Sequence, residues 1–411
     1  MRILLCSNFY YRRGGDCTYL LALQRLLEQH GHETAVFSMR HPQNLACPQE
    51  PYFVDHLDYA ELNRAKNPAN AVKVLQRSIW SNQARRRIAR LIADWKPDLA
   101  HLQNIHAYLT PAIIGPLRRA GVPMVWTLHD YKLICPNDNF YSNGRICEEC
   151  KGGRYWRCAR NRCKKNSFAA STVVALEAAV HRWLGVGKPV GRFIAPSHFV
   201  KGKFTECGYA PDRIAVMPHF LETPPPSATA GSYGLYAGTL MPFKGVGTLL
   251  QALAKASPHP FHILGGGAML EEYRRQAREL GLEQVVFRGF LSGAELSAAL
   301  AGAAYAVVPS EWWETFSYAA QEPLARGLPV IAANLGALPE LVVDGQTGLL
   351  FPAGNAAALA EQIDRLWGDA GLRRRLGAQA REFTCAKCDA ERYYRELMDL
   401  YAAVRQTPPR A

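Results

Sequence analysis

The chain has 411 residues, of which 48% are hydrophobic and 20% are charged, so it can bury a large core and is not intrinsically disordered. Its formal net charge of +13 favours an anionic partner, such as a nucleic acid, an anionic lipid or an anionic substrate. A length prior of roughly 150 residues per domain predicts two or three domains. No apolar run is long enough to predict a membrane-spanning helix, and the N-terminal apolar run is too short for a signal peptide. We therefore expect a cytosolic protein.

Strands and helices alternate along both halves of the chain. In the first half we expect an amphipathic helix at 20–29 and strands at 3–7, 34–38, 98–102 and 124–128. In the second half we expect strands at 233–237, 261–264, 285–287, 305–308 and 330–333, with helices between them. This alternation predicts an α/β fold with parallel sheets covered by helices.

A segment rich in proline and small polar residues separates the two halves. The predicted organisation is an N-terminal domain over 1–220, a linker over 221–231, a second domain over 232–385 and a terminal segment 386–411. The terminal segment has the pattern of an amphipathic helix, and we expect it to pack back on the N-terminal domain. Two α/β halves joined in this way predict a ligand cleft between them.

Two carboxylates, Glu314 and Glu322, flank an aromatic and several small residues in the second half. The pattern predicts Glu314 in a loop and Glu322 about two turns along a helix that ends at Gly327, before a buried strand. A helix N-terminus attracts phosphate, and a carboxylate can accept two hydrogen bonds from a vicinal diol. The pair could therefore hold a nucleotide diphosphate between two sugars; alternatively, both are solvated charges at a helix end.

Glycine-rich turns follow several predicted strands. They are Gly14-Gly15, Gly238 through Lys244-Gly245, Gly265–Gly267 and Gly336 through Gly348. His129-Asp130 also follows a strand, at the end that faces a ligand crevice in open parallel sheets. Glycine lets the backbone approach a phosphate closely, and Lys244 supplies a cation. Each piece alone is typical of ordinary turns, and the information lies in their order.

That order resembles the glycosyltransferase family 4 members of the GT-B fold, over nearly the whole chain. The resemblance implies two Rossmann-like α/β/α domains that face each other across a cleft, and a retaining transfer from a nucleotide-activated sugar without a required metal ion. It also implies a site role for Gly15, His129, Gly238, Thr239, Lys244, Gly266, Glu314, Phe316, Ser317, Tyr318 and Glu322.

The roles implied by the resemblance divide into catalysis and donor binding. His129, Glu314 and Lys244 would be catalytic: His129 would approach the transferred sugar, Glu314 would bind its hydroxyls and Lys244 would neutralise the diphosphate. Glu322 would hold the ribose, and the remaining residues would line the donor. A fixed cation and helix N-terminal amides would stabilise the charge that develops on the leaving group. The family commonly has arginine where this chain has Thr239, so low turnover or an inactive, sugar-nucleotide-binding relative is an alternative.

A cysteine-rich insert occupies residues 131–166. Cys147 and Cys150 form a C-x2-C pair, and Cys158 and Cys163 follow within the same basic stretch. Four thiolates suit tetrahedral zinc, so the insert predicts a structural zinc site, with Cys135 as another possible ligand. An iron–sulfur cluster and free thiols are the alternatives.

The leading hypothesis is a cytosolic retaining glycosyltransferase that uses a UDP- or GDP-sugar. Its acceptor would be a glycan or polyprenyl-linked unit of a bacterial surface polysaccharide. Two clusters of basic residues, one within 85–90 and one within 151–165, would touch anionic lipid at the inner membrane face. The alternatives are nucleic-acid binding through the basic insert and a glycoside hydrolase. Retaining hydrolases need carboxyls about 5–5.5 Å apart, which the spacing of Glu314 and Glu322 disfavours.

Overall fold

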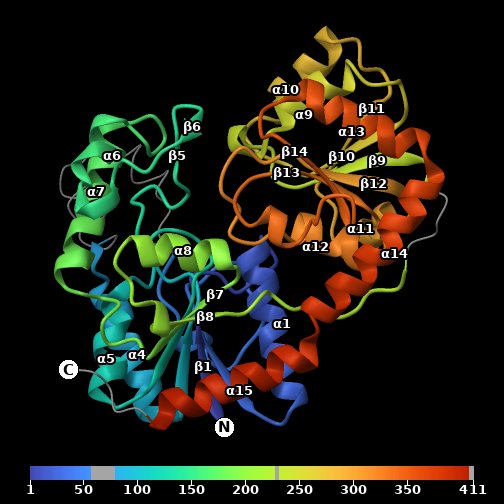
Figure 1. Ribbon diagram of the computed structural model, residues 1–411. Coiled ribbons are helices and arrows are strands. Elements are labelled where there is room, and N and C mark those ends of the chain that lie inside the picture. Colours follow the sequence, from blue (N-terminus) through green and yellow to red (C-terminus); the bar gives the residue numbers. More distant parts are fainter. Residues whose placement is uncertain (57–78, 227–230, 407–411) are drawn as a thin grey trace. The chain divides into compact units, whose positions relative to one another are not determined.

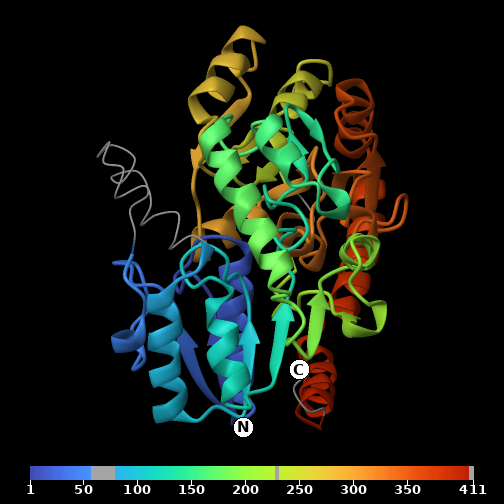
Figure 2. The same cartoon turned by 90° about the vertical axis from the view of Figure 1, so that its left-hand side faces the viewer.

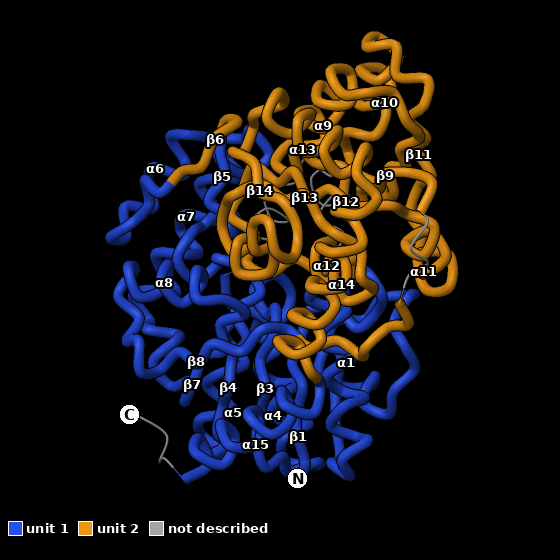
Figure 3. Tube along the Cα trace, turned by 45° about the vertical axis from the view of Figure 1, so that its right-hand side comes forward, with its two compact units in different colours: residues 1–142, 148–219, 390–411 blue, residues 143–147, 220–389 orange. Residues whose placement is uncertain are grey.

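The structure is a computed structural model that describes residues 1–56, 79–226 and 231–406. It divides into two compact units, which Figure 3 shows in different colours. The first takes in residues 1–142, 148–219 and the C-terminal segment from 390, and the second takes in 143–147 and 220–389. Each unit is built around a parallel sheet of its own.

The sheet of the first unit has the strand order β2-β1-β3-β4-β7-β8, and every neighbouring pair is parallel. Its central strands are buried along their whole length, as expected for a sheet covered on both faces. The strands are β1 (Arg2–Cys6), β2 (Glu33–Phe37), β3 (Leu99–Leu102), β4 (Met124–Thr127), β7 (Arg192–Ala195) and β8 (Ile214–Val216).

Helices lie on both faces of this sheet (Figures 1 and 2). One layer pairs α4 with α5, and the other pairs α1 with the C-terminal helix α15. The first-unit helices are α1 (Gly15–Gln29), α4 (Asn82–Trp95), α5 (Ile114–Arg119), α6 (Trp156–Arg160), α7 (Phe168–Trp183), α8 (His198–Glu206) and α15 (Ala390–Gln406). The helix α15 is held by buried side chains: the Tyr401 hydroxyl lies 2.6 Å from His101 Nδ1, and the Tyr393 hydroxyl contacts that of Tyr19. The short strands β5 (Tyr141–Ser142) and β6 (Arg145–Ile146) form a separate hairpin.

The sheet of the second unit has the order β11-β10-β9-β12-β13-β14 and is parallel throughout. One continuous apolar core joins its strands to the covering helices. The strands are β9 (Tyr233–Ala237), β10 (Phe261–Leu264), β11 (Val285–Gly289), β12 (Ala303–Val308), β13 (Val330–Ala333) and β14 (Gly348–Phe351).

Two groups of helices cover this second sheet on opposite faces (Figure 1). Helices α9, α10 and α13 pack together, as do α12 and α14. The helices are α9 (Val246–Leu253), α10 (Leu270–Glu279), α11 (Gly293–Ala301), α12 (Tyr318–Ala325), α13 (Ala356–Gly368) and α14 (Ala370–Lys387). Among the described residues, no helix is both long enough and apolar enough to cross a membrane.

Candidate functional site

The strand order of the second unit predicts a ligand-binding position at the carboxyl ends of β9 and β12. The order runs outward through β10 and β11 on one side and through β13 and β14 on the other, so it reverses between these two strands. Loops that leave adjacent strands in opposite directions open a crevice at that point, where open α/β sheets bind ligands. The loop after β9 carries Gly238 and Lys244, and the loop after β12 carries Glu314.

Lys244 and Glu314, from the loops after these two strands, form an ion pair. Lys244 Nζ lies 2.7 Å from Glu314 Oε1, and the Ser310 hydroxyl donates to the same oxygen at 2.6 Å. The Glu314 side chain is only 6% exposed, whereas that of Lys244 is 21% exposed. The lysine cation therefore compensates a nearly buried carboxylate while it keeps access to solvent and to a ligand.

Glycines let three loops pack against one another beside this ion pair. Gly245 has φ +71°, and a Cβ there would lie 1.9 Å from the carbonyl oxygen of Pro309. Gly265 has φ +132°, and its Cβ would lie 1.8 Å from the carbonyl oxygen of Gly238. Both positions require glycine, because a side chain would separate the loops. Gly266 has open space around it, and its carbonyl accepts from Leu240 N at 2.9 Å.

Thr239 is exposed at the end of β9. Its carbonyl accepts a hydrogen bond from the Tyr236 hydroxyl at 3.0 Å. The structure thus presents a short neutral side chain on the loop that also carries Lys244.

The helix after Glu314 starts later than the sequence predicted. Phe316 packs into the apolar core, Ser317 has an extended backbone and is the N-cap, and Tyr318 is the first residue of α12. Glu322 is therefore the fifth helical residue, just over one turn along, and not two turns along as predicted. The prediction of the helix end was closer, since α12 ends at Ala325 and Gly327 follows with φ +83°.

Burial affects the charge of Glu322. It raises the pKa of this carboxyl, and the nearby Arg326 guanidinium opposes the shift. Among the described residues, no hydrogen bond to the Glu322 carboxylate is found. A partly buried acceptor of this kind suits a ligand hydroxyl, which would supply the hydrogen bond that it lacks.

The first unit brings its predicted site residues to the carboxyl ends of its own strands. Gly15 is the exposed first residue of α1, after β1, and His129 follows β4. His129 Nε2 lies 2.6 Å from the amide oxygen of Gln103, which follows β3. Because an amide oxygen only accepts, this contact assigns the proton to Nε2. The His129 ring also packs against Tyr19 and His219, with ring centroids 5.1 and 5.2 Å away.

Burial keeps His129 uncharged. It lowers the pKa of this imidazole to about 4, although the Asp16 carboxylate opposes the shift. Its neighbour Asp130 responds in the opposite sense, because burial and the Asp138 carboxylate raise the pKa of Asp130 to about 7. Both residues line a pocket in the first unit with Gln103 and Trp126. At neutral pH this pocket presents a neutral imidazole, whose Nε2 donates to Gln103 and whose Nδ1 is the hydrogen-bond acceptor.

The four predicted zinc ligands are divided between the two compact units. Cys147 belongs to the segment 143–147, which groups with the second unit, and Cys150, Cys158 and Cys163 belong to the first unit. These last three share one small apolar cluster. A hydrogen bond between Cys158 and Cys163 lowers the pKa of Cys163 to about 6 and raises the pKa of Cys158. Cys135 acts electrostatically on Cys158, so its thiol lies near the same cluster.

Some residues of these sites were missed by sequence reasoning. Ser310 supports Glu314, and Gln103 orients His129. The Trp312 ring lies under Lys244, whose Nζ is 4.9 Å from the ring centroid, and the buried Trp312 Nε1 has no hydrogen-bond partner among the described residues. Gln103 directly follows a predicted strand and Ser310 lies two residues after another, and this position was the signal that could have identified them.

Comparison with known proteins assigns both halves of the chain. Residues 13–223 match the family model described as Glycosyltransferase Family 4, and residues 226–383 match that described as Glycosyl transferases group 1. An uncharacterized glycosyltransferase of Methanocaldococcus jannaschii is 32% identical over 174 residues, which are 41% of this chain and 49% of that protein. A D-inositol 3-phosphate glycosyltransferase of Streptomyces bingchenggensis is 36% identical over 160 residues. That match covers 36% of this chain and 35% of the relative, so the chain spans about half or less of these relatives.

Solved structures share the fold over nearly the full length. Sucrose-phosphate synthase from Thermosynechococcus elongatus matches with a TM-score of 0.71 and 20% identity, over 98% of each chain. HepE from Anabaena, solved in complex with UDP-glucose, matches with a TM-score of 0.67 and 18% identity, over 98% of this chain and 100% of that one. With both family models matched in order and a parallel α/β sheet in each unit, the chain belongs to glycosyltransferase family 4 and has the two-domain, Rossmann-like GT-B fold.

Proposed function

We propose that this protein is a retaining glycosyltransferase that moves a hexose from a nucleotide-sugar to a glycan or polyprenyl-linked acceptor in the biosynthesis of a cell-surface polysaccharide. The observation that carries the proposal is the Lys244–Glu314 ion pair at the switch point between β9 and β12. A cation and a carboxylate at that point match the two parts of a sugar diphosphate. Structural relatives bound to UDP and UDP-glucose favour a UDP-sugar over a GDP-sugar.

In the proposed reaction, the bond between the anomeric carbon and the diphosphate oxygen breaks, and the acceptor oxygen bonds to the same face of that carbon. The acceptor proton passes to the departing phosphate. Lys244 and the first amides of α12, at Ser317 and Tyr318, would stabilise the diphosphate charge. Glu314 would accept from sugar hydroxyls and Glu322 from the ribose. His129, uncharged at neutral pH, would act as a hydrogen-bond partner of the sugar and not as an acid.

The experiment for this proposal is a donor panel. Purified protein is incubated with UDP-, GDP- and ADP-sugars, and free nucleotide is quantified for wild type, Glu322→Ala and Lys244→Ala, with exposed Lys255→Ala as the matched control. Release from one donor that both site variants lose, and the control keeps, supports the proposal. Equal release by all variants, or no release and no binding, refutes it. NMR of the product's anomeric proton tests retention, and unchanged release in EDTA tests the proposal that catalysis needs no metal ion.

We also propose peripheral contact with an anionic membrane, from the cytoplasmic side. Helix α7 exposes an apolar stripe that contains Phe168, Leu176 and Trp183, which are 60%, 46% and 84% exposed. These side chains recur at helical spacing on one face, and the insert that precedes the helix carries exposed basic residues such as Arg160 and Lys165. Apolar anchors beside cations are typical of surfaces that bind anionic lipid headgroups.

Vesicle flotation tests this contact. Wild type should float with phosphatidylglycerol-containing vesicles at low salt, and Phe168→Ser/Trp183→Ser should not. Phe290→Ser is the control, because this side chain is 67% exposed but lies in the second unit. Failure of the wild type to float would refute membrane contact. Binding to duplex DNA that survives moderate salt would instead favour the nucleic-acid alternative.

For the cysteine-rich insert we propose a structural zinc ion held by Cys147, Cys150, Cys158 and Cys163. The grouping of Cys150, Cys158 and Cys163 in one small cluster supports this, because four thiolates are a common ligand set for structural zinc. Substitution by Co²⁺ should give a thiolate-to-metal charge-transfer band that Cys150→Ser loses. A cobalt-loaded protein without this band would refute the proposal.

A further inference from the structure

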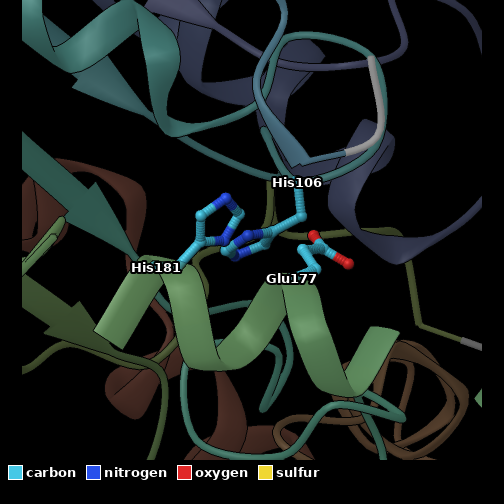
Figure 4. A group of neighbouring side chains, drawn as sticks. All are labelled: His106, Glu177 and His181. Atoms are coloured by element: carbon cyan, nitrogen blue, oxygen red, sulfur yellow. The ribbon is translucent and has the colours of Figure 1, made fainter. Parts of the chain in front are cut away.

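A second group of metal-ligand side chains lies in the first unit, apart from the cysteines. His106, on the loop after β3, meets Glu177 and His181 of α7, and one potential ligand atom from each lies within 4.8 Å of the other two. All three residues are buried. Figure 4 shows Glu177 and His181 rising from the same helix toward His106. Their spacing of four residues places both on one helix face.

The hydrogen bonds of the two histidines leave nitrogen atoms for a ligand. His181 Nε2 lies 2.8 Å from the carbonyl oxygen of Ile79 and must donate to it, which leaves a lone pair on Nδ1. His106 is only 8% exposed, and its buried Nδ1 has no hydrogen-bond partner among the described residues. A buried polar atom without a partner is costly, and a metal ion would satisfy it.

The charge around the group is balanced by Lys132. Its Nζ lies 2.8 Å from Glu177 Oε2, and the same ammonium donates to the Pro136 carbonyl at 2.9 Å. The group thus consists of two imidazoles and one carboxylate, whose charge a lysine compensates.

We propose that His106, Glu177 and His181 form a binding site for a divalent transition-metal ion such as Zn²⁺, which ties α7 to the loop after β3. Two imidazole nitrogens and one carboxylate oxygen are a frequent zinc ligand set, with water in the fourth position. Ligands about 2.0–2.2 Å from a tetrahedral ion lie roughly 3.4 Å from one another. Movements on the order of 1 Å would therefore close the site from the observed spacing.

Metal content distinguishes this site from the cysteines. Chelator-treated full-length protein is titrated with ZnCl₂ and, separately, CoCl₂. Cys150→Ser removes the thiolate charge-transfer band, so the nitrogen–oxygen site in this variant should give cobalt ligand-field bands alone. This spectrum is informative even where a histidine variant folds poorly. His106→Asn and His181→Asn should each lose one equivalent of metal. The control His259→Asn removes a buried histidine of the second unit and should keep it.

A substitution of Lys132 should strengthen metal binding, whereas the histidine substitutions should abolish it. Lys132→Met removes the competing cation, so Zn²⁺ should bind to this variant more tightly than to wild type. Glu177→Gln should bind it more weakly, by at least the roughly 10- to 100-fold that loss of an outer-shell partner costs. Equal metal content in the wild type, His106→Asn and His181→Asn, or weaker binding by Lys132→Met, would overturn the proposal.

Discussion

The Lys244–Glu314 ion pair gives the sharpest prediction about the stability of the second unit. Lys244→Met leaves the nearly buried Glu314 carboxylate with the Ser310 hydroxyl as its partner. Removing one member of a buried ion pair costs 3–5 kcal/mol, and we take about 3 kcal/mol because the lysine is partly exposed. At roughly 2–4 °C per kcal/mol for a unit of this size, the Tm should fall by about 6–12 °C.

A double-mutant cycle separates the ion pair from the loss of packing. In Lys244→Met/Glu314→Gln the buried group is neutral, and the amide oxygen can still accept from Ser310. We therefore expect the double variant to be more stable than Lys244→Met alone. Scanning calorimetry measures the transitions, because two units need not unfold as one. Lys255→Met is the control, since this lysine is exposed.

Two results would refute the reasoning about this ion pair. One is a Tm of Lys244→Met within about 1 °C of wild type, since breaking a buried pair should shift it by several times that. The other is a double variant whose loss of stability equals the sum of the losses measured for Lys244→Met and Glu314→Gln alone. Either result would mean that water screens the Glu314 carboxylate despite its low exposure, and that the pair exists for ligand binding alone.

Three further predictions concern a glycine in a tight turn and the pKa shifts of Glu322 and His129. In urea unfolding, Gly245→Ala should lower the free energy of unfolding far more than Gly345→Ala. Gly345 has a similar φ of +69° but open space around it, so Gly345→Ala should cost only about 1 kcal/mol. Burial raises the pKa of Glu322 in the fold, so the unfolding free energy should fall as pH rises above 4.5, and Glu322→Gln should flatten this slope. With its pKa near 4, His129 should add no inflection near pH 6.5 to the pH profile of nucleotide release; one that His129→Asn abolishes would contradict this.

The sequence predicted the strands well because their patterns are local. Strands β9, β10 and β13 have the predicted residues, and β4 ends one residue earlier than predicted. The sheet strands β7, β8 and β14 were not predicted from the sequence. A short apolar run bounded by turn residues is sufficient to mark a buried strand. The α/β fold with parallel sheets followed from the alternation of such runs with helices, and the structure confirms it.

The predictions from sequence were wrong or incomplete where contacts between residues distant in sequence determine the local structure. Thr315 and Phe316 are compatible with a helix, but Phe316 turns into the core and delays the start of α12. This displaced Glu322 from its predicted place. The group of His106, Glu177 and His181 was missed because the fold brings the loop after β3 to a distant helix. Only the spacing of Glu177 and His181 on one helix face was visible in the sequence.

Topology explains why residues so far apart in sequence form the candidate sites. In the second unit the strand order reverses between β9 and β12, and the loops after these strands carry Lys244 and Glu314. In the first unit it reverses between β1 and β3, whose following segments carry Gly15 and Gln103. At each reversal two loops diverge and leave a crevice lined by both. The turn motifs locate the loops along the chain, but only the strand order determines which loops become neighbours, and that order is not local information.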